Sequence, residues 1–231
     1  PYNTFAIKKD GTLWAWGLNS GGHLGIGDTI NRSSPVQIIG NYKHIETSYF
    51  SAFAIKTDGT LWTWGDNYTG ILGQNDRIAR SNPAQIPGIW QTVAAGQSGV
   101  VAIKDNGTVF SWGQNANGVL GTGDTIDRSS PVQINLTNLT KISGFRSGFT
   151  AIRNQSGTTD LVGCGYSALG ALGNTTPNFA PYPIQIIPTY ANNNVIAVAG
   201  RAYGNSVLLR NRITPFPTPT PTPTPSPTLY R

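Results

Sequence analysis

The sequence predicts an all-β protein made of repeated units of four short antiparallel strands, and three observations support this prediction. One pattern, AIKKDGTLWAWG in its first copy, recurs at a spacing of 48 residues. Glycine and aromatic residues are frequent and charged residues make up only 11% of the chain, as in proteins of many short strands joined by tight turns. Apolar and polar residues alternate at a period of two, and helical signals are nearly absent.

The pattern has three regular copies and a weaker fourth. The regular copies cover residues 6–17, 54–65 and 102–113. The fourth copy, residues 151–165, carries Cys164 in place of the second tryptophan, and a half copy ends at Arg210. We therefore expect repeat units near residues 1–42, 43–90, 91–139 and 140–194, with a partial unit at 195–213.

Each copy begins with a predicted hairpin whose turn contains Asp and Gly, as in Asp10 and Gly11. A loop rich in glycine and asparagine follows. It contains a Leu-Gly pair, whose glycine we expect to adopt a backbone conformation that a side chain would forbid. The leucines of these pairs are Leu24, Leu72, Leu120 and Leu172.

Two further runs complete each unit. The first is opened by a proline, which suits an edge strand, at Pro35, Pro83, Pro131 and Pro183. The second leads back into the next hairpin and begins at Lys43, Trp90, Thr140 and Val195. Each unit thus supplies four strands.

Four antiparallel strands per repeat describe the blade of a β-propeller, in which neighbouring blades cover both faces of a sheet. The chain contains about four such blades, which form either a small closed ring or an arc of a larger one. We expect the paired aromatic residues of the hairpins to pack between blades, where each buries about 150–250 Å². An aromatic ligand site is the weaker alternative, because these residues recur where a blade needs bulk. They are Trp14, Trp16, Trp62, Trp64, Phe110 and Trp112.

The pattern AIKxDGTLWxWGxNxxGxLGxGDTxxRSSPVQI, read over residues 6–38 and again in the next two copies, resembles the regulator of chromosome condensation repeat. The resemblance covers nearly all of residues 1–210 and implies a propeller, of seven blades in typical members. The regular copies are most similar to those of bacterial and phage members. The family includes an exchange factor for a small GTPase, a plant photoreceptor and an inhibitor of β-lactamase, so the resemblance implies no single function.

From Thr214 the composition changes to alternating threonine and proline. Such a tract favours polyproline II, so we predict an extended stalk or linker over residues 214–231. Its hydroxyls are candidates for O-glycosylation. These candidates are Thr218, Thr220, Thr222 and Thr224.

Residues suited to catalysis are scarce. His23 and His44 occupy different segments of the repeat and do not recur, and Cys164 has no evident base. No metal-binding motif appears, so we expect no enzyme, cofactor or metal site. The recurring aspartates are more typical of turns than of a cation site. They are Asp28, Asp76 and Asp124.

Two series of basic residues recur. Arg32, Arg80 and Arg128 precede the prolines, and as a ring on one face they are candidates to bind an anionic glycan, a phosphate or an acidic protein surface. Pairing with an aspartate in the same turn is the favoured explanation for the second series. This series is Lys8, Lys56, Lys104, Arg153 and Arg210.

The sequence thus favours a non-catalytic structural or interaction module, displayed on a virion or a cell surface and therefore extracellular. Its partners would be other protein chains, including copies of itself, or an anionic glycan. A net charge of +6 is typical of a solvated face, so we expect no nucleic-acid partner, and no apolar run is long enough for membrane insertion. The alternative is a soluble regulatory protein that binds a protein partner on one propeller face.

Overall fold

A computed structural model of the chain describes residues 2–97, 99–155, 158–166, 179–187, 194–199 and 207–211. All regular structure in these residues is β-strand, which confirms the predicted all-β class. The predicted stalk, with Thr218, Thr220, Thr222 and Thr224, lies outside the described residues, as does Leu172. The strands are Asn3–Ile7 (β1), Thr12–Gly17 (β2), Arg32–Thr47 (β3), Ser51–Lys56 (β4), Thr60–Gly65 (β5), Arg80–Ala95 (β6), Gly99–Lys104 (β7), Val109–Gly113 (β8), Arg128–Ile134 (β9), Leu139–Phe145 (β10), Gly148–Gln155 (β11), Thr158–Tyr166 (β12), Phe179–Ile187 (β13), Asn194–Ala199 (β14) and Val207–Asn211 (β15).

The hairpins form where the alternating pattern and the Asp-Gly turns predict them. In the β1–β2 hairpin the Asp10 carboxylate accepts hydrogen bonds from the backbone N–H and the hydroxyl of Thr12, at 3.0 and 2.7 Å. Gly11 has a φ of 85°, which explains why the turn needs glycine. The β4–β5 hairpin repeats these bonds with Asp58 and Thr60.

The two runs that follow each loop are joined in a way that the sequence did not predict. In the first two links, the proline-opened run and the return run form one strand of 16 residues, β3 or β6. The first half of β3 pairs with β2 and its second half pairs with β4, with a change of register on either side of Gly40. The φ of 130° at Gly40 lets the strand turn from one sheet into the next without ending. In the third link β9 and β10 remain separate strands.

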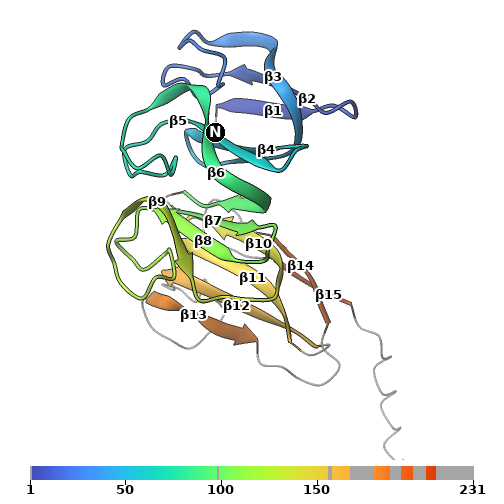
Figure 1. Cartoon of the computed structure of the whole chain (residues 1–231), viewed down its shortest axis with the longest axis vertical. Coiled ribbons are helices and arrows are strands. Elements are labelled where there is room, and N and C mark those ends of the chain that lie inside the picture. The colour runs from blue at the N-terminus through green and yellow to red at the C-terminus, as the bar shows by residue number, and fades with distance from the viewer. Residues whose placement is uncertain are drawn as a thin grey trace, which may run out of the picture.

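Three sets of four antiparallel strands succeed one another along the chain (Figure 1). The first set joins the second half of β3 to β4, β5 and the first half of β6, and the next joins the second half of β6 to β7, β8 and β9. The third contains β10, β11, β12 and β13. The described sheets do not close into a ring, so the number of blades stays a prediction.

The hydrophobic core is divided among the spaces between successive sheets. Trp64 packs with Leu13 and Leu24 from the preceding unit. Trp112 packs with Leu72 in the next space, and Cys164 occupies the equivalent position in the space after that. Each sheet is therefore stabilised mainly by its immediate neighbours.

A hydrogen bond crosses each of these spaces. The Trp64 indole N–H donates to the His23 carbonyl at 3.1 Å, and the Trp112 indole N–H donates to the Ile71 carbonyl at 2.7 Å. The Cys164 thiol contacts the Val119 carbonyl in the same way, at 3.4 Å. The glycine of the Leu-Gly pair makes room for the indole, because a Cβ at Gly25 would lie 2.7 Å from the Trp64 Nε1 atom.

The structure separates the members of each aromatic pair. Trp64 and Trp112 are fully buried between sheets. Trp16, whose face is covered by no preceding sheet in the described residues, is only partly buried. The remaining members lie two residues earlier on the same face of their strands, closer to the hairpin turn, and are also partly exposed. They are Trp14, Trp62 and Phe110.

We expect Trp64→Ala to reduce the free energy of unfolding by about 3–5 kcal/mol, because it opens a cavity between two sheets. Trp64→Phe keeps most of the ring but leaves the His23 carbonyl without its donor, so its expected cost is about 1–3 kcal/mol. Urea denaturation followed by circular dichroism measures both values. The matched control is Trp62→Ala in the same strand; a loss as large as that of Trp64→Ala would contradict the assignment of the core to the buried indole.

Candidate functional site

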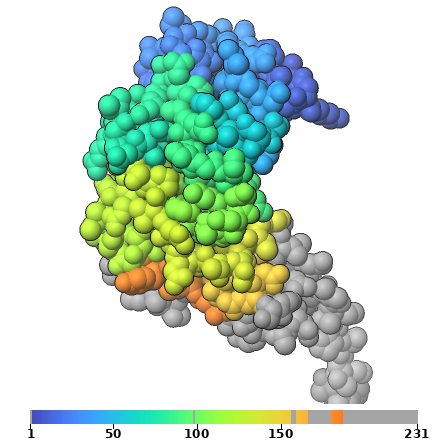
Figure 2. Space-filling model, in the orientation of Figure 1, coloured from blue at the N-terminus to red at the C-terminus, as the bar shows by residue number. Residues whose placement is uncertain are grey.

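Three equivalent loops project from one side of the stacked sheets: residues 18–31, 66–79 and 114–127 (Figure 1). Each loop rests on the last strand of the next sheet, because Gly27 N donates to Ser81 O at 2.9 Å and Asn75 N donates to Ser129 O at 2.7 Å. The space-filling view shows them as an unbroken flank from blue to yellow-green (Figure 2). We call the surface of these three loops the loop face.

A buried asparagine organises the inside of each loop. The Asn67 amide nitrogen donates to both the carbonyl and the carboxylate of Asp76, each at 3.0 Å, and its oxygen accepts from the Leu72 backbone N–H at 2.9 Å. Asn19 and Asn115 make the equivalent bonds. Sequence reasoning missed these asparagines, although their recurrence in the WGxN pattern was a usable signal.

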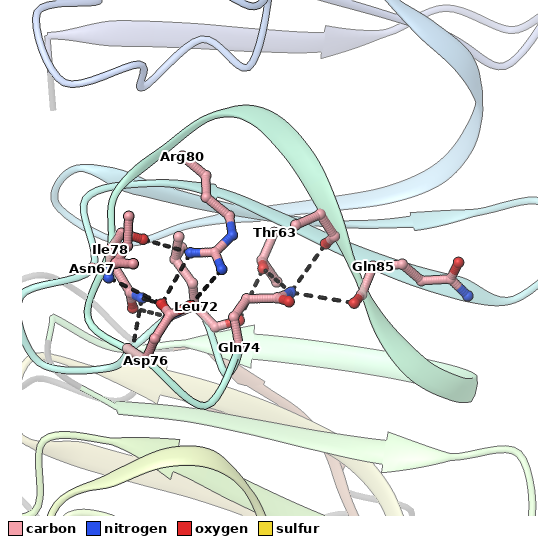
Figure 3. Close-up of polar contacts among 9 residues, drawn as sticks. Thr63, Asn67, Leu72, Gln74, Asp76, Ile78, Arg80 and Gln85 are labelled. Carbon is pink, nitrogen blue, oxygen red and sulfur yellow. Dashed lines mark hydrogen bonds and ion pairs between the residues drawn. The ribbon is translucent and has the colours of Figure 1, made fainter.

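An aspartate and an arginine complete the network, as the close-up of the second loop shows (Figure 3). The Arg80 guanidinium donates to the Asp76 carboxylate at 2.6 and 3.0 Å and to the Ile78 carbonyl at 2.6 Å. Asp76 also accepts from the Ile78 backbone N–H at 3.0 Å. We call this set of three side chains the Asn–Asp–Arg network.

These bonds stabilise the charged form of each aspartate. Hydrogen bonds from Arg80, followed by the Ile78 N–H, lower the pKa of Asp76 to about 2. In the first and third loops, the backbone N–H of Ile30 or Ile126 is the main cause that lowers the pKa of Asp28 or Asp124. The recurring aspartates therefore stabilise turns, and the carboxylate of each one is engaged by hydrogen bonds from its own loop.

The arginine series lies on the loop face, but each guanidinium is paired within its own loop. Arg32 pairs with Asp28, Arg80 with Asp76, and Arg128 with Asp124. The arginine side chains are only 23–25% exposed. The sequence suggested that these arginines form a ring of free positive charge that contacts an anionic partner. In the structure each arginine is instead part of an ion pair. Partner binding by these residues stays a prediction.

A second ion pair joins two loops. Arg77 of the second loop contacts Asp127 of the third, with a distance of 3.1 Å between the guanidinium nitrogen and the carboxylate oxygen. The Arg77 side chain is 59% exposed. Charges on the loop face are thus compensated between loops as well as within them.

Large apolar side chains stand at equivalent positions of this compensated face. Ile30, Ile78 and Ile126 are 66%, 68% and 63% exposed. Each backbone is held on both sides, since the N–H donates to the aspartate and the carbonyl accepts from the arginine of the same loop. The side chain is left to face solvent, and Tyr68 adds an exposed ring to the second loop. Sequence reasoning missed the three isoleucines, although they also recur in all three regular copies.

The lysine series takes aromatic rings as its partners. The Nζ atom of Lys56 lies 3.9 Å from the centre of the Trp62 ring, and that of Lys8 lies 4.4 Å from the Trp14 ring. Lys104 stacks over Phe110 in the same way. The pairing expected from the sequence was with the turn aspartates instead. The lysine stem covers one face of each ring, so these rings are half buried although no neighbouring sheet covers them completely.

In the weaker fourth copy the basic residue pairs with an acidic side chain and not with an aromatic ring. Val162 stands where the regular copies carry an aromatic residue opposite the preceding strand. Arg153 donates instead to the buried Asp160 carboxylate, at 2.6 and 3.1 Å. Arg210 lies in β15, and its side chain is outside the described part of the structure.

The remaining candidate groups are dispersed. His23 stacks on Phe50 and its Nε2 atom lies 3.4 Å from an Asp66 oxygen, whereas the His44 Nε2 atom lies 3.0 Å from the Val93 carbonyl. Burial raises the pKa of the Cys164 thiol. Among the described residues, no three histidine, cysteine or acidic side chains gather to hold a metal ion. The described residues also include no helix of the length and apolarity that a membrane span requires.

The regulator of chromosome condensation (RCC1) repeat matches residues 10–52, 58–103 and 106–148, which together make up more than half of the chain. The chain belongs to the RCC1 repeat family. A second form of the RCC1 repeat matches residues 42–71 and 90–119. The matches carry no indication of a bacterial or phage source.

Solved structures share the fold of this chain. Human WBSCR16 matches with a TM-score of 0.78 and 21% identity, over 92% of this chain and 56% of that one. Yeast RCC1 (Prp20), solved with Kap60 bound, matches with a TM-score of 0.77 and 19% identity, over 92% of this chain and 52% of that one. The chain thus spans about half the length of these RCC1-like structures.

One curated relative is similar over a short segment. Ras guanine nucleotide exchange factor C of Dictyostelium discoideum is 49% identical over 37 residues, which are 16% of this chain and 2% of that protein. The likeness is confined to less than one repeat of 48 residues.

The Asn–Asp–Arg network predicts an acid-sensitive step in stability. Because the folded state holds the pKa of Asp76 below its ordinary value of 3.8, the ionised carboxylate adds stability at neutral pH. This contribution is lost as the pH falls from 3.8 through about 2. We expect Asp76→Asn to be less stable than the wild type at neutral pH and to lose less stability over this acid range. Urea denaturation at a series of pH values measures the effect, and the exposed Asp105→Asn variant is the control. Equal acid dependence in Asp76→Asn and the wild type would contradict the prediction.

Proposed function

We propose that the chain is a non-catalytic module that binds a protein partner through its loop face. The observation that carries the proposal is the row of exposed isoleucines, Ile30, Ile78 and Ile126, on a surface whose charges are already paired. Apolar anchors with few free charges are characteristic of the centre of protein–protein interfaces. This is the soluble regulatory alternative of the sequence analysis.

The family relatives favour the same reading. One solved RCC1 is in complex with Kap60, and another study of Prp20p from Saccharomyces cerevisiae concerns its binding to Gsp1p and histones. A module of the same fold that holds a protein on one face is consistent with both. The relatives lend no support to display on a virion or a cell surface, to a glycan ligand or to a homo-oligomer.

The rigidity of the loops favours tight contact. Each isoleucine is presented by a backbone that the Asn–Asp–Arg network holds at its N–H and its carbonyl, so little conformational entropy is lost when a partner binds. Covering one exposed isoleucine supplies about 1.5–3 kcal/mol at most. Three such contacts on one face are enough to anchor a complementary apolar surface.

The compensated charges argue for a protein over an anionic glycan. An anionic ligand needs cationic groups free to donate to it, as guanidinium groups do at phosphate and carboxylate sites. On the loop face Arg32, Arg80 and Arg128 already donate to an aspartate and a carbonyl. An anionic ligand would have to displace these internal bonds.

The experiment compares the full chain with a triple variant in which Ile30, Ile78 and Ile126 are changed to lysine. Immobilised protein is probed with purified Gsp1p, Kap60 and core histones, and photo-crosslinkers on the loop face identify contacts in an extract of the source cells. We expect one of these proteins to bind the wild type. The triple variant should bind the same protein with an affinity at least about tenfold lower.

The control is Ile39→Lys, since Ile39 is 91% exposed but lies in β3, outside the three loops. It should bind the partner as the wild type does, and circular dichroism should report the same fold in all variants. Binding that survives the triple change, or that Ile39→Lys weakens equally, would contradict the proposal. If the only crosslinks join two copies of the chain, the proposal of a different protein partner is wrong and the loop face mediates self-association.

A further inference from the structure

The third hairpin turn differs from the first two at the residue that precedes its glycine. The first and second turns contain Asp10-Gly11 and Asp58-Gly59, whereas the third contains Asn106-Gly107. An asparagine followed by glycine can lose its side-chain amide without an enzyme, because the glycine N atom reaches the asparagine Cγ atom with no Cβ to obstruct it.

The third turn is open to this reaction. Both Asn106 and Gly107 are exposed. A Cβ placed on Gly107 would meet nothing within 4 Å, so no neighbouring element packs against the turn. The Gly107 N–H donates to the Lys104 carbonyl at 2.9 Å, and this bond must open first. Opening an exposed turn disturbs few other contacts.

We propose that Asn106 is a self-modification site that converts, through a cyclic succinimide, to aspartate and isoaspartate. The Gly107 nitrogen loses its proton and forms a bond to the Asn106 Cγ atom, and the bond from Cγ to Nδ2 breaks to release ammonia. Water then hydrolyses the resulting succinimide at one of its two carbonyls. Opening at one carbonyl gives aspartate and opening at the other gives isoaspartate; no electrons are gained or lost.

The chain itself displays the aspartate product at the equivalent positions. The Asn106 oxygen accepts from the N–H and the hydroxyl of Thr108 at 3.1 and 2.7 Å. Asp10 uses one oxygen for the same two bonds to Thr12, at 3.0 and 2.7 Å. Aspartate at position 106 therefore fits the turn and adds a negative charge, whereas isoaspartate adds an atom to the backbone and disrupts the register with Thr108.

A second Asn-Gly pair in the same chain provides an internal control. Asn117 is exposed, but Gly118 is buried, and a Cβ on it would lie 2.6 Å from the Pro181 Cα atom. The Gly118 N–H also donates to the Asn115 carbonyl at 2.9 Å. The reaction at Asn117 requires the loop to leave the next sheet, so the fold protects this site.

The test incubates the purified full chain at mildly alkaline pH and follows both sites by peptide mass spectrometry after digestion in acid. The peptide with Asn106 should exchange its amide for a hydroxyl at least about tenfold faster than the peptide with Asn117. In urea, where the fold no longer protects either site, the two rates should become similar. Equal rates in the folded chain, a faster reaction at Asn117, or an intact Asn106 would overturn the proposal.

A second measurement tests whether the product fits. Asn106→Asp should unfold at the same urea concentration as the wild type, because Asp10 and Asp58 make the same turn. A marked loss of stability in Asn106→Asp would contradict the assignment of position 106 as a site that accepts aspartate.

Discussion

Each sheet is held to the one before it by a buried side chain that reaches a loop carbonyl. In two spaces this side chain is a tryptophan, Trp64 or Trp112, which combines a large apolar surface with one donor. The carbonyl would otherwise be buried without a partner, so the hydrogen bond and the packing support each other. In the third space Cys164 supplies less bulk and a weaker donor. Because the carbonyl belongs to the loop, the contact that stacks the sheets also positions the surface that the loops present.

Much of the fold follows from the repeated pattern. The Asp-Gly turns, the alternating strands and the Leu-Gly loops are local features, and local chemistry determines them. The continuity of β3 through Gly40 is different, because a glycine with positive φ either ends a strand or bends it, and the neighbouring sheet decides which. The same holds for the aromatic pairs, whose two members share a face of the strand but differ in how far the neighbouring sheet covers them.

The candidate site was less predictable than the fold. Asp76 and Arg80 both recur in the sequence four residues apart, but their pairing depends on how the loop curves around Asn67. Once the pairing is known, the arginine series changes from a set of free charges to part of the internal framework. The exposed isoleucines emerge only then, because the sequence alone gives no reason for Ile78 to point away from a core. Lys56 likewise lies across its own hairpin and contacts the Trp62 ring, an arrangement that the sequence pattern alone does not predict.

The two long strands also determine how the array responds to mechanical load. A strand that pairs with one sheet at its start and the next sheet at its end ties the two together through the covalent chain and two ladders at once. Moving one of these sheets away from the next therefore strains the ladders at both ends of β3 or β6 as well as the packing between the sheets. Between β9 and β10 this tie is interrupted by a short segment with Asn138 at a φ of 59°. The sheets on either side of this segment are held by their packing and by a connecting segment that is not a shared strand, so the backbone couples them less directly than it couples the sheets joined by β3 or β6.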